Sequence, residues 1–264
     1  MAVIGAVLFA IYAVAAVIAM GIFQWPLWLV LLGSIALIGF QYKIGKWGAI
    51  RSVGAQDLPE EQFGWIHQTT EEMSREMGID KPRLMIARMG APNAFAVGRR
   101  GAGTVVIAEE LLQVLNRDEV EGVIAHELAH IRNRDVVTMV IGQGIASVAA
   151  IVAQWVIIAT GDNYLVDLFL ALIVGQIVHL LVMLFVFPIS RYREYVADSD
   201  ASDVIGGGEP LARALEKISQ GNHQARETAT DDVTALCIFG EGGGLANLLS
   251  THPPTEKRIA RLRN

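Results

Sequence analysis

Residues 116–160 read NRDEVEGVIAHELAHIRNRDVVTMVIGQGIASVAAIVAQWVIIAT, and this stretch joins two kinds of helix. Its first part begins with Asn116 and has Glu119 three residues later, a capping-box pattern that marks the start of a helix. Its second part, Val136 to Thr160, contains no charged residue and is long enough to cross the hydrocarbon core of a bilayer. The stretch therefore predicts a polar helix that is followed at once by a membrane span.

The composition of the whole chain agrees with a membrane protein. Of its 264 residues 53% are hydrophobic and 18% are charged, whereas a typical soluble domain has roughly 25% charged residues. The net charge of −6 provides no basic surface, so we expect no nucleic-acid partner. The single cysteine, Cys237, excludes an internal disulfide framework and a CxxC metal site.

Four uncharged blocks predict four transmembrane helices: Met1–Phe23, Pro26–Tyr42, Val136–Thr160 and Leu168–Ile189. The first block is interpreted as a retained span, because no basic residue precedes it and another apolar block follows it. Basic residues flank only one side of the blocks, and they are Lys43, Lys46, Arg51, Arg132, Arg134, Arg191 and Arg193. The opposite loops, 24–26 and 161–167, contain no Lys or Arg, so the positive-inside rule predicts cytoplasmic termini and cytoplasmic polar segments.

Outside the spans, the sequence predicts a mixed α+β domain in which helices dominate. Periodicity and turn signals predict helices at 57–79, 109–115, 116–131, 192–204, 210–220 and 254–262, and strands at 83–88, 94–98 and 104–108. The glycine-rich residues 98–103 predict a hairpin turn between the last two strands. Residues 221–232 are polar and are expected to form a loop.

The polar helix carries His126-Glu127-Leu128-Ala129-His130, an HExxH motif. Histidines at i and i+4 project from one face of a helix, so both can bind the same metal ion. Glu127 lies beside them and can accept a proton from water that zinc has made more acidic. A chance match on a surface helix is the alternative, but the capped and apolar-flanked helix favours a site for one Zn²⁺ per chain.

A catalytic zinc site needs a third protein ligand, and the sequence offers several carboxylates. Those near the motif in sequence are Glu109, Glu110, Glu121 and Asp135. Glu194 is the stronger candidate, because an antiparallel hairpin of the third and fourth spans returns residues 189–194 to the membrane face of residues 130–135. Asp198, one helical turn after Glu194, is placed to orient a ligating imidazole. The alternative is that both are ordinary surface acids of a helix.

Four motifs together resemble the HtpX-type membrane metalloproteases, relatives of the CAAX prenyl proteases, over nearly the whole chain. They are Pro92–Gly98, Ala125–His130 with Asn133 and Asp135, Ser190–Arg191 with Arg193–Asp198, and His252–Pro254 with Arg258–Ile259. The resemblance implies a gluzincin-like site with His126, His130 and Glu194 on zinc, Glu127 as the general base and Asp198 behind His126. It also implies a stress-response role in membrane-protein quality control. The chain is shorter than the many-span CAAX prenyl proteases, so that activity is not expected.

The resemblance also assigns substrate binding to an edge strand containing Asn93, Ala94, Phe95 and Ala96. Main-chain pairing holds any extended sequence and suits broad specificity, whereas an ordinary hairpin strand is the alternative. His252 or Arg258 is a candidate donor to the developing oxyanion, and we take His252 as the predicted catalytic residue. The alternative is that His252-Pro253-Pro254 only shapes the start of the last helix.

On this interpretation the chain has four parts. Residues 1–42 form a transmembrane hairpin, 43–135 the first part of a protease domain, 136–189 a second hairpin, and 190–264 the second part of the protease domain. The predicted function is a zinc endopeptidase that cleaves misfolded or damaged membrane proteins at the cytoplasmic face of the cell membrane. Its expected partners are these protein substrates and the lipid bilayer.

A non-catalytic membrane transporter or scaffold with an accidental HExxH motif is the alternative function. Such proteins often carry paired charges near the middle of the membrane, but the four apolar blocks contain no Asp, Glu, Lys or Arg. The one histidine inside them, His179, is expected to be a neutral imidazole bonded to a neighbouring helix.

Overall fold

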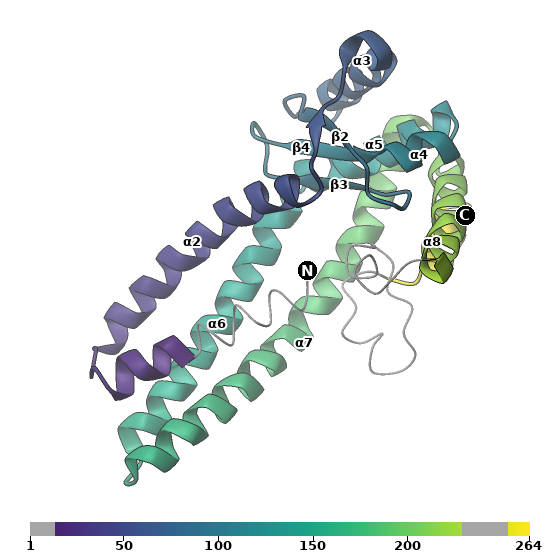
Figure 1. Cartoon of the computed structure of the whole chain (residues 1–264). Helices are drawn as coiled ribbons and strands as arrows, with labels where there is room; N and C mark the ends of the chain where they lie inside the picture. The colour runs from purple at the N-terminus through teal and green to yellow at the C-terminus, as the bar shows by residue number, and fades with distance from the viewer. Residues whose placement is uncertain (1–13, 229–252) are drawn as a thin grey trace. The chain divides into compact units, whose positions relative to one another are not determined.

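The computed structural model describes residues 14–228 and 253–264, which form two compact units (Figure 1). The first, here called the apolar unit, contains the described residues up to Ile44 and the segment Met139–Pro188. The second, here called the α/β unit, contains the described residues of Gly45–Thr138 and Ile189–Asn264.

The apolar unit is built from helices. Helices α2 (Leu27–Ser52), α6 (Asp135–Thr160) and α7 (Tyr164–Ile205) contribute to it and continue into the α/β unit, and residues 14–21 are also helical. Most residues in the apolar windows of α6 and α7 are not buried, and Phe185 is 76% exposed. A core helix of a soluble protein buries such side chains, so this exposure favours a surface that faces lipid.

The structure supports the prediction of four spans only in part. Helices α6 and α7 are long and apolar enough to cross a bilayer. Helix α2 contains a shorter apolar stretch, Leu27–Leu37, and runs beyond the predicted block to Ser52. Residues 1–13 of the first predicted span lie outside the described residues. The part of the prediction that is confirmed is a mainly helical protein with two strongly apolar helices and a small sheet.

Small residues let α6 and α7 approach each other closely within the apolar unit. A side chain on Gly175 of α7 would overlap the amide of Gln154 of α6. Farther along the pair, the imidazole of His179 bonds the backbone of Ala146, which is fully buried. His179 therefore lies against a neighbouring helix, as its position in the sequence predicted.

Two predicted boundaries were wrong. A separate helix had been expected at 192–204, but helix α7 continues through Pro188 to Ile205. Membrane helices tolerate the loss of the backbone hydrogen bond that proline causes. Helix α8 (Glu209–Thr228) also continues through residues 221–228, which had been assigned to a loop. That stretch contains Gln, Ala, Arg and Glu, which are good helix formers despite their polarity.

The α/β unit contains a four-stranded sheet in the order β1-β2-β4-β3, and Figure 1 labels β2, β3 and β4. Its strands are β1 (Gln56–Asp57), β2 (Arg83–Ala87), β3 (Ala94–Val97) and β4 (Thr104–Ala108). Strands β2 and β4 are parallel, whereas β1 pairs with β2 and β3 pairs with β4 in antiparallel fashion. The predicted hairpin is therefore present, and β3 forms one edge of the sheet.

The central strand β4 separates two hydrophobic clusters. Val105 and Ile107 belong to the larger cluster, whereas Val106 packs on the other side with Met85 and Ala87, as the alternation of a strand requires. The helices that contribute to the larger cluster are α3 (Glu60–Glu76), α4 (Glu109–Val114), α5 (Arg117–Arg132), α8, the part of α7 in this unit and α10 (Thr255–Leu262). Helix α5, which carries the HExxH motif, is thus part of the core.

Helix α5 is fixed at its start and along its length. Asn116 and Glu119 form the predicted capping box, and the buried carboxylate of Glu119 also pairs with Lys217 of α8. A Cβ on Gly122 would lie 3.0 Å from the backbone nitrogen of Leu211, so glycine allows α8 to pack directly against α5. These contacts give the motif a rigid support.

Candidate zinc site

Helix α5 presents its two motif histidines to a common point. The two Nε2 atoms of His126 and His130 lie 3.0 Å apart, and the rings meet edge to face. His126 and the neighbouring Glu127 are each only 7% exposed. The i, i+4 spacing therefore places two imidazole nitrogens where one ion can contact both.

Glu194 reaches the same point from α7. Its Oε2 lies 3.6 Å from Nε2 of His126, and its Oε1 lies 3.6 Å from Nε2 of His130. One ligand atom from each of these three residues lies within 4.8 Å of the others. In the described part of the chain, this is the one group of three or more such side chains that could hold a metal ion.

The other carboxylates considered as third ligands have different partners. Glu109 pairs with Arg88, Glu110 accepts hydrogen bonds from the backbone of Met89 and Gly90, and Glu121 pairs with Arg117. Asp135 contacts His130, but through Nδ1 rather than through the Nε2 that faces Glu194. None of the four therefore belongs to the group formed by the two histidines and Glu194.

Asp198 lies behind the first histidine. Its Oδ1 is 3.0 Å from Nδ1 of His126, the ring nitrogen opposite the one that faces Glu194. Arg258 of α10 donates two hydrogen bonds to the Asp198 carboxylate, at 2.9 and 2.6 Å, and its Nη1 lies 3.2 Å from Glu194. Arg258 is 2% exposed, so this ion pair is sealed from water.

Sequence reasoning had considered Arg258 only as a donor to the oxyanion. Its pairing with Asp198 joins residues that lie 60 positions apart, and no spacing rule connects α7 to α10. A short amphipathic helix with an arginine on its apolar face was the one available signal, because a buried arginine requires a buried carboxylate. The predicted catalytic His252 lies outside the described residues.

The carboxylates change the protonation of the histidines. Burial and the charge of Arg258 oppose a proton on His126, but hydrogen bonds to Asp198 and Glu194 outweigh them and raise its pKa to about 9. Burial and the neighbouring His126 lower the pKa of His130. Burial also opposes the charge of Asp198, but hydrogen bonds from His126 and Arg258 lower its pKa. Without metal at neutral pH, His126 therefore holds a proton and His130 does not.

The charge balance of the site fits a divalent cation. The three carboxylates of Glu127, Glu194 and Asp198 face one guanidinium, that of Arg258, so the buried region carries two net negative charges once a metal has displaced the proton of His126. Two imidazoles and one carboxylate are also the ligand set of catalytic zinc sites that keep a position open for water. The residues present therefore fit zinc both in charge and in donor type.

The predicted substrate strand is adjacent to the motif helix. Strand β3 contacts α5 and pairs with β4 on its inner side. Its start is fixed by a hydrogen bond from the Ala108 nitrogen to the Asn93 carbonyl, and Phe95 and Ala96 are partly exposed. The strand thus offers a sheet edge beside the helix that carries Glu127.

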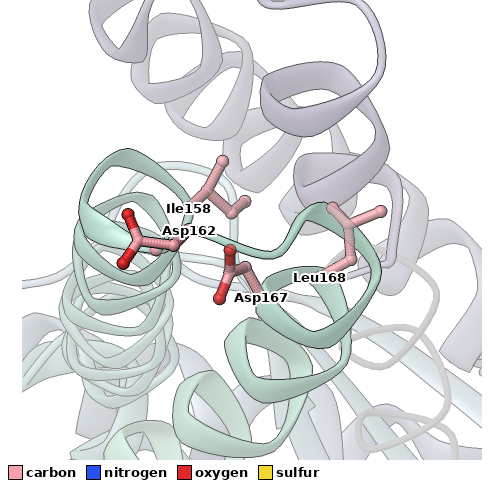
Figure 2. A pocket seen from close by; sticks show the side chains of 5 residues that line it. Ile158, Asp162, Asp167 and Leu168 are labelled. Carbon is pink, nitrogen blue, oxygen red and sulfur yellow. The ribbon is translucent and has the colours of Figure 1, made fainter.

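A pocket in the apolar unit has different chemistry. Figure 2 shows it at the turn between α6 and α7, and its lining residues are Ile158, Gly161, Asp162, Asp167 and Leu168. Asp167 accepts a hydrogen bond from the Asn163 nitrogen at the start of α7. This contact is a helix cap, and the pocket contains no residue of the motifs described above.

A capped HExxH helix with a glutamate from a second helix at the same point defines a zinc-dependent metallopeptidase. Comparisons with known proteins agree. The family model described as "Peptidase family M48" matches residues 60–264, and the chain belongs to this family.

Several relatives extend the similarity beyond that domain. The chain is 55% identical to the protease HtpX homolog of Halobacterium salinarum over 100% of both chains. It is 36% identical to that of Aquifex aeolicus, over 87% of this chain and 82% of the relative. A crystal structure of S. mikatae Ste24p has a similar fold, with a TM-score of 0.66 at 18% identity. That match covers 94% of this chain, which spans only 60% of the length of the solved chain.

These findings confirm the resemblance to HtpX-type proteases that was drawn from the motifs. The chain is a membrane zinc metalloprotease, and the alternative of a non-catalytic transporter or scaffold is not favoured. Its cofactor is zinc, for which His126, His130 and Glu194 form a fitting group. Its substrates are proteins.

Proposed function

We propose that this protease is an endopeptidase that cleaves misfolded or damaged membrane proteins at the cytoplasmic face of the cell membrane. The observation that carries the proposal is the meeting of His126, His130 and Glu194 beside Glu127 in a chain whose apolar helices have bilayer length. The edge strand β3 supports broad specificity, because an extended substrate can pair with its backbone at Asn93, Ala94, Phe95 and Ala96.

The residues have separate roles in the proposed reaction. His126, His130 and Glu194 hold zinc, which when bound supplies Lewis acidity that makes water more acidic and a carbonyl more electrophilic. Glu127 accepts the proton of the attacking water and returns it to the amine of the leaving peptide. Asp198, supported by Arg258, keeps His126 oriented with Nε2 toward the ion. The guanidinium of Arg258 is already engaged by Asp198, Glu194 and His126, so we assign oxyanion stabilisation to His252.

The proposed topology has four spans, in residues 1–42 and 136–189, with the protease domain formed by residues 43–135 and 190–264. Its support is the distribution of basic residues, since the short loops at 24–26 and 161–167 contain none. An epitope tag inserted at 161–167 is expected to react only with a probe outside the cytoplasm, and one added after Asn264 only with a cytoplasmic probe. Reversed labelling would overturn the orientation.

Substitution of Glu127 tests the catalytic proposal. In the purified full-length protein, Glu127→Gln is expected to retain zinc but to slow cleavage of an unfolded model protein by about 10²–10⁴-fold, the usual contribution of a general base. Glu121→Gln is the matched control, because Glu121 lies on the same helix and pairs with Arg117 instead. Native cleavage by Glu127→Gln, or equal losses in both variants, would contradict the proposed role.

A further inference from the structure

Each motif histidine contacts a carboxylate through the ring nitrogen that faces away from Glu194. For His126 this carboxylate is Asp198, which in turn is held by Arg258. For His130 it is Asp135, whose Oδ2 lies 2.5 Å from Nδ1. Asp135 follows the HExxH motif but has no role in the proposed reaction as described above, so the function of this second contact remains to be assigned.

Asp135 also has an arginine partner. Arg193 of α7 pairs with the Oδ1 atom of Asp135 and donates a hydrogen bond of 3.1 Å to the Asn133 carbonyl at the end of α5. The side chains of Asp135 and Arg193 are 12% and 13% exposed. The arrangement His130–Asp135–Arg193 thus repeats the arrangement His126–Asp198–Arg258 with residues from different parts of the chain.

The backbone between the two residues is shaped for this contact. On an uninterrupted helix, a residue five positions after His130 would point about 140° away from it around the axis. Helix α5 instead ends at Arg132, and Arg134 adopts a positive φ of 56°, which few residues other than glycine adopt. This break lets the first residue of α6 contact the imidazole of His130.

We infer that Asp135 is a positioning residue for the second zinc-binding histidine, with Arg193 holding its carboxylate in place. The inference rests on the proposed ligand set of His126, His130 and Glu194. A carboxylate that accepts the Nδ1 proton leaves Nε2 as the free, more basic donor toward the metal. Asp135 is not a ligand itself, because it lies on the opposite side of the ring from Glu194.

A purely structural role for Asp135 is the competing explanation, and Asp200 provides a matched control for it. Asp200 stabilises the same turn between α5 and α6, since it accepts a hydrogen bond of 2.7 Å from Asn133 and pairs with Arg132 at 3.3 Å. These partners of Asp200 are not histidines of the zinc site. Loss of the Asp200 carboxylate therefore weakens the turn between α5 and α6 without removing a contact of the His130 imidazole.

The test compares zinc affinity in full-length protein in detergent, measured by competition with a chelator. Asp135→Asn is expected to weaken zinc binding by about 10–100-fold, as is typical when the partner of a ligating histidine is lost, and Asp135→Glu to recover part of the loss. Asp200→Asn is expected to bind zinc like the native protein. With cobalt in place of zinc, the visible absorption spectrum is expected to change in Asp135→Asn but not in Asp200→Asn.

Native zinc affinity and a native cobalt spectrum in Asp135→Asn would overturn the inference, as would equal losses in Asp135→Asn and Asp200→Asn. If Asp135→Asn does not fold, Arg193→Gln replaces it, and unchanged zinc affinity in that variant would also overturn the inference. His130→Ala separates the inference from its premise. If His130→Ala loses zinc strongly and Asp135→Asn binds it normally, only the role of Asp135 is contradicted. If His130→Ala binds zinc with native affinity, the proposed ligand set is contradicted as well.

Discussion

The apolar unit and the α/β unit both bury polar side chains, but the partners of these side chains differ between the two units. In the apolar unit, the hydroxyls of Ser34 and Ser147 donate to backbone carbonyls one turn earlier in the same helix. In the α/β unit the buried polar groups include charged side chains, and their partners come from other helices. For example, Arg258 of α10 donates a hydrogen bond to Asp198 of α7. Among the described residues of the apolar unit, no Asp, Glu, Lys or Arg is buried.

The difference follows from the two surroundings. A hydrogen bond within one helix needs no other segment, so it suits a helix surrounded by lipid. A buried charge instead requires a counter-charge in good geometry, and in the α/β unit this requirement links α5, α7 and α10. Substitutions of buried polar residues should therefore have large effects in the α/β unit and small effects in the apolar unit.

The largest effect is expected for Arg258→Ala. Without its guanidinium, the carboxylates of Asp198 and Glu194 remain buried without their main cationic partner, and removal of one partner from a buried ion pair costs about 3–5 kcal/mol. Thermal unfolding of metal-free protein in detergent measures this loss. Arg263→Ala is the control, because Arg263 pairs with Glu209 and Glu216 on the surface, where water screens the charges, and its loss should destabilise the protein far less. Equal destabilisation by the two variants would contradict the comparison.

An intermediate effect is expected for the pH dependence of zinc binding. The raised pKa of His126, about 9, means that zinc must displace one proton at neutral pH, whereas the lowered pKa of His130 means that this residue is already deprotonated. Zinc affinity should therefore rise by about tenfold per pH unit between about pH 7 and pH 9, and level off above. Calorimetry in buffers of different ionisation enthalpy should detect about one released proton at pH 7. No released proton would show that His126 is not charged in the metal-free protein.

The smallest effect is expected for Gln154→Leu in the apolar unit. The Gln154 side chain is fully buried, and neither of its amide atoms has a hydrogen-bond partner among the described residues. Replacement by an apolar side chain of similar size should change the free energy of unfolding by less than about 1 kcal/mol, or increase it. Ala150→Leu, one turn earlier and equally buried, should cost about 1–3 kcal/mol through overpacking. A large loss in Gln154→Leu alone would indicate a polar role for this amide.

Local patterns in the sequence predicted the parts of the fold that depend on neighbouring residues. The capping box of Asn116 and Glu119, the hairpin of β3 and β4, and the single-face spacing of His126 and His130 each follow from a few adjacent residues. Glu194 lies beside the motif histidines, as the expected antiparallel hairpin of the third and fourth spans predicts, and its role as a ligand stays a prediction.

The features that the sequence did not predict depend on contacts between distant segments. Arg258 meets Asp198 across 60 positions, and the place of Arg258 on the apolar face of α10 does not identify its partner. The contact of Asp135 with His130 required the positive φ of Arg134, an unusual conformation for arginine. The continuation of α7 past Ile189 was missed because the apolar pattern of the predicted span ends there, although the helix does not.

The central claim is that Glu194 completes the zinc site from a distant helix, while Asp198 only orients a ligand. Zinc binding by full-length Glu194→Gln and Asp198→Asn, measured in detergent beside the native protein, tests this claim directly. Glu194→Gln should lose most of its zinc at a free concentration that saturates the native protein, because a neutral amide is a poor zinc ligand. Asp198→Asn should weaken binding by only about 10–100-fold. Native affinity in Glu194→Gln, or a greater loss in Asp198→Asn, would contradict the account.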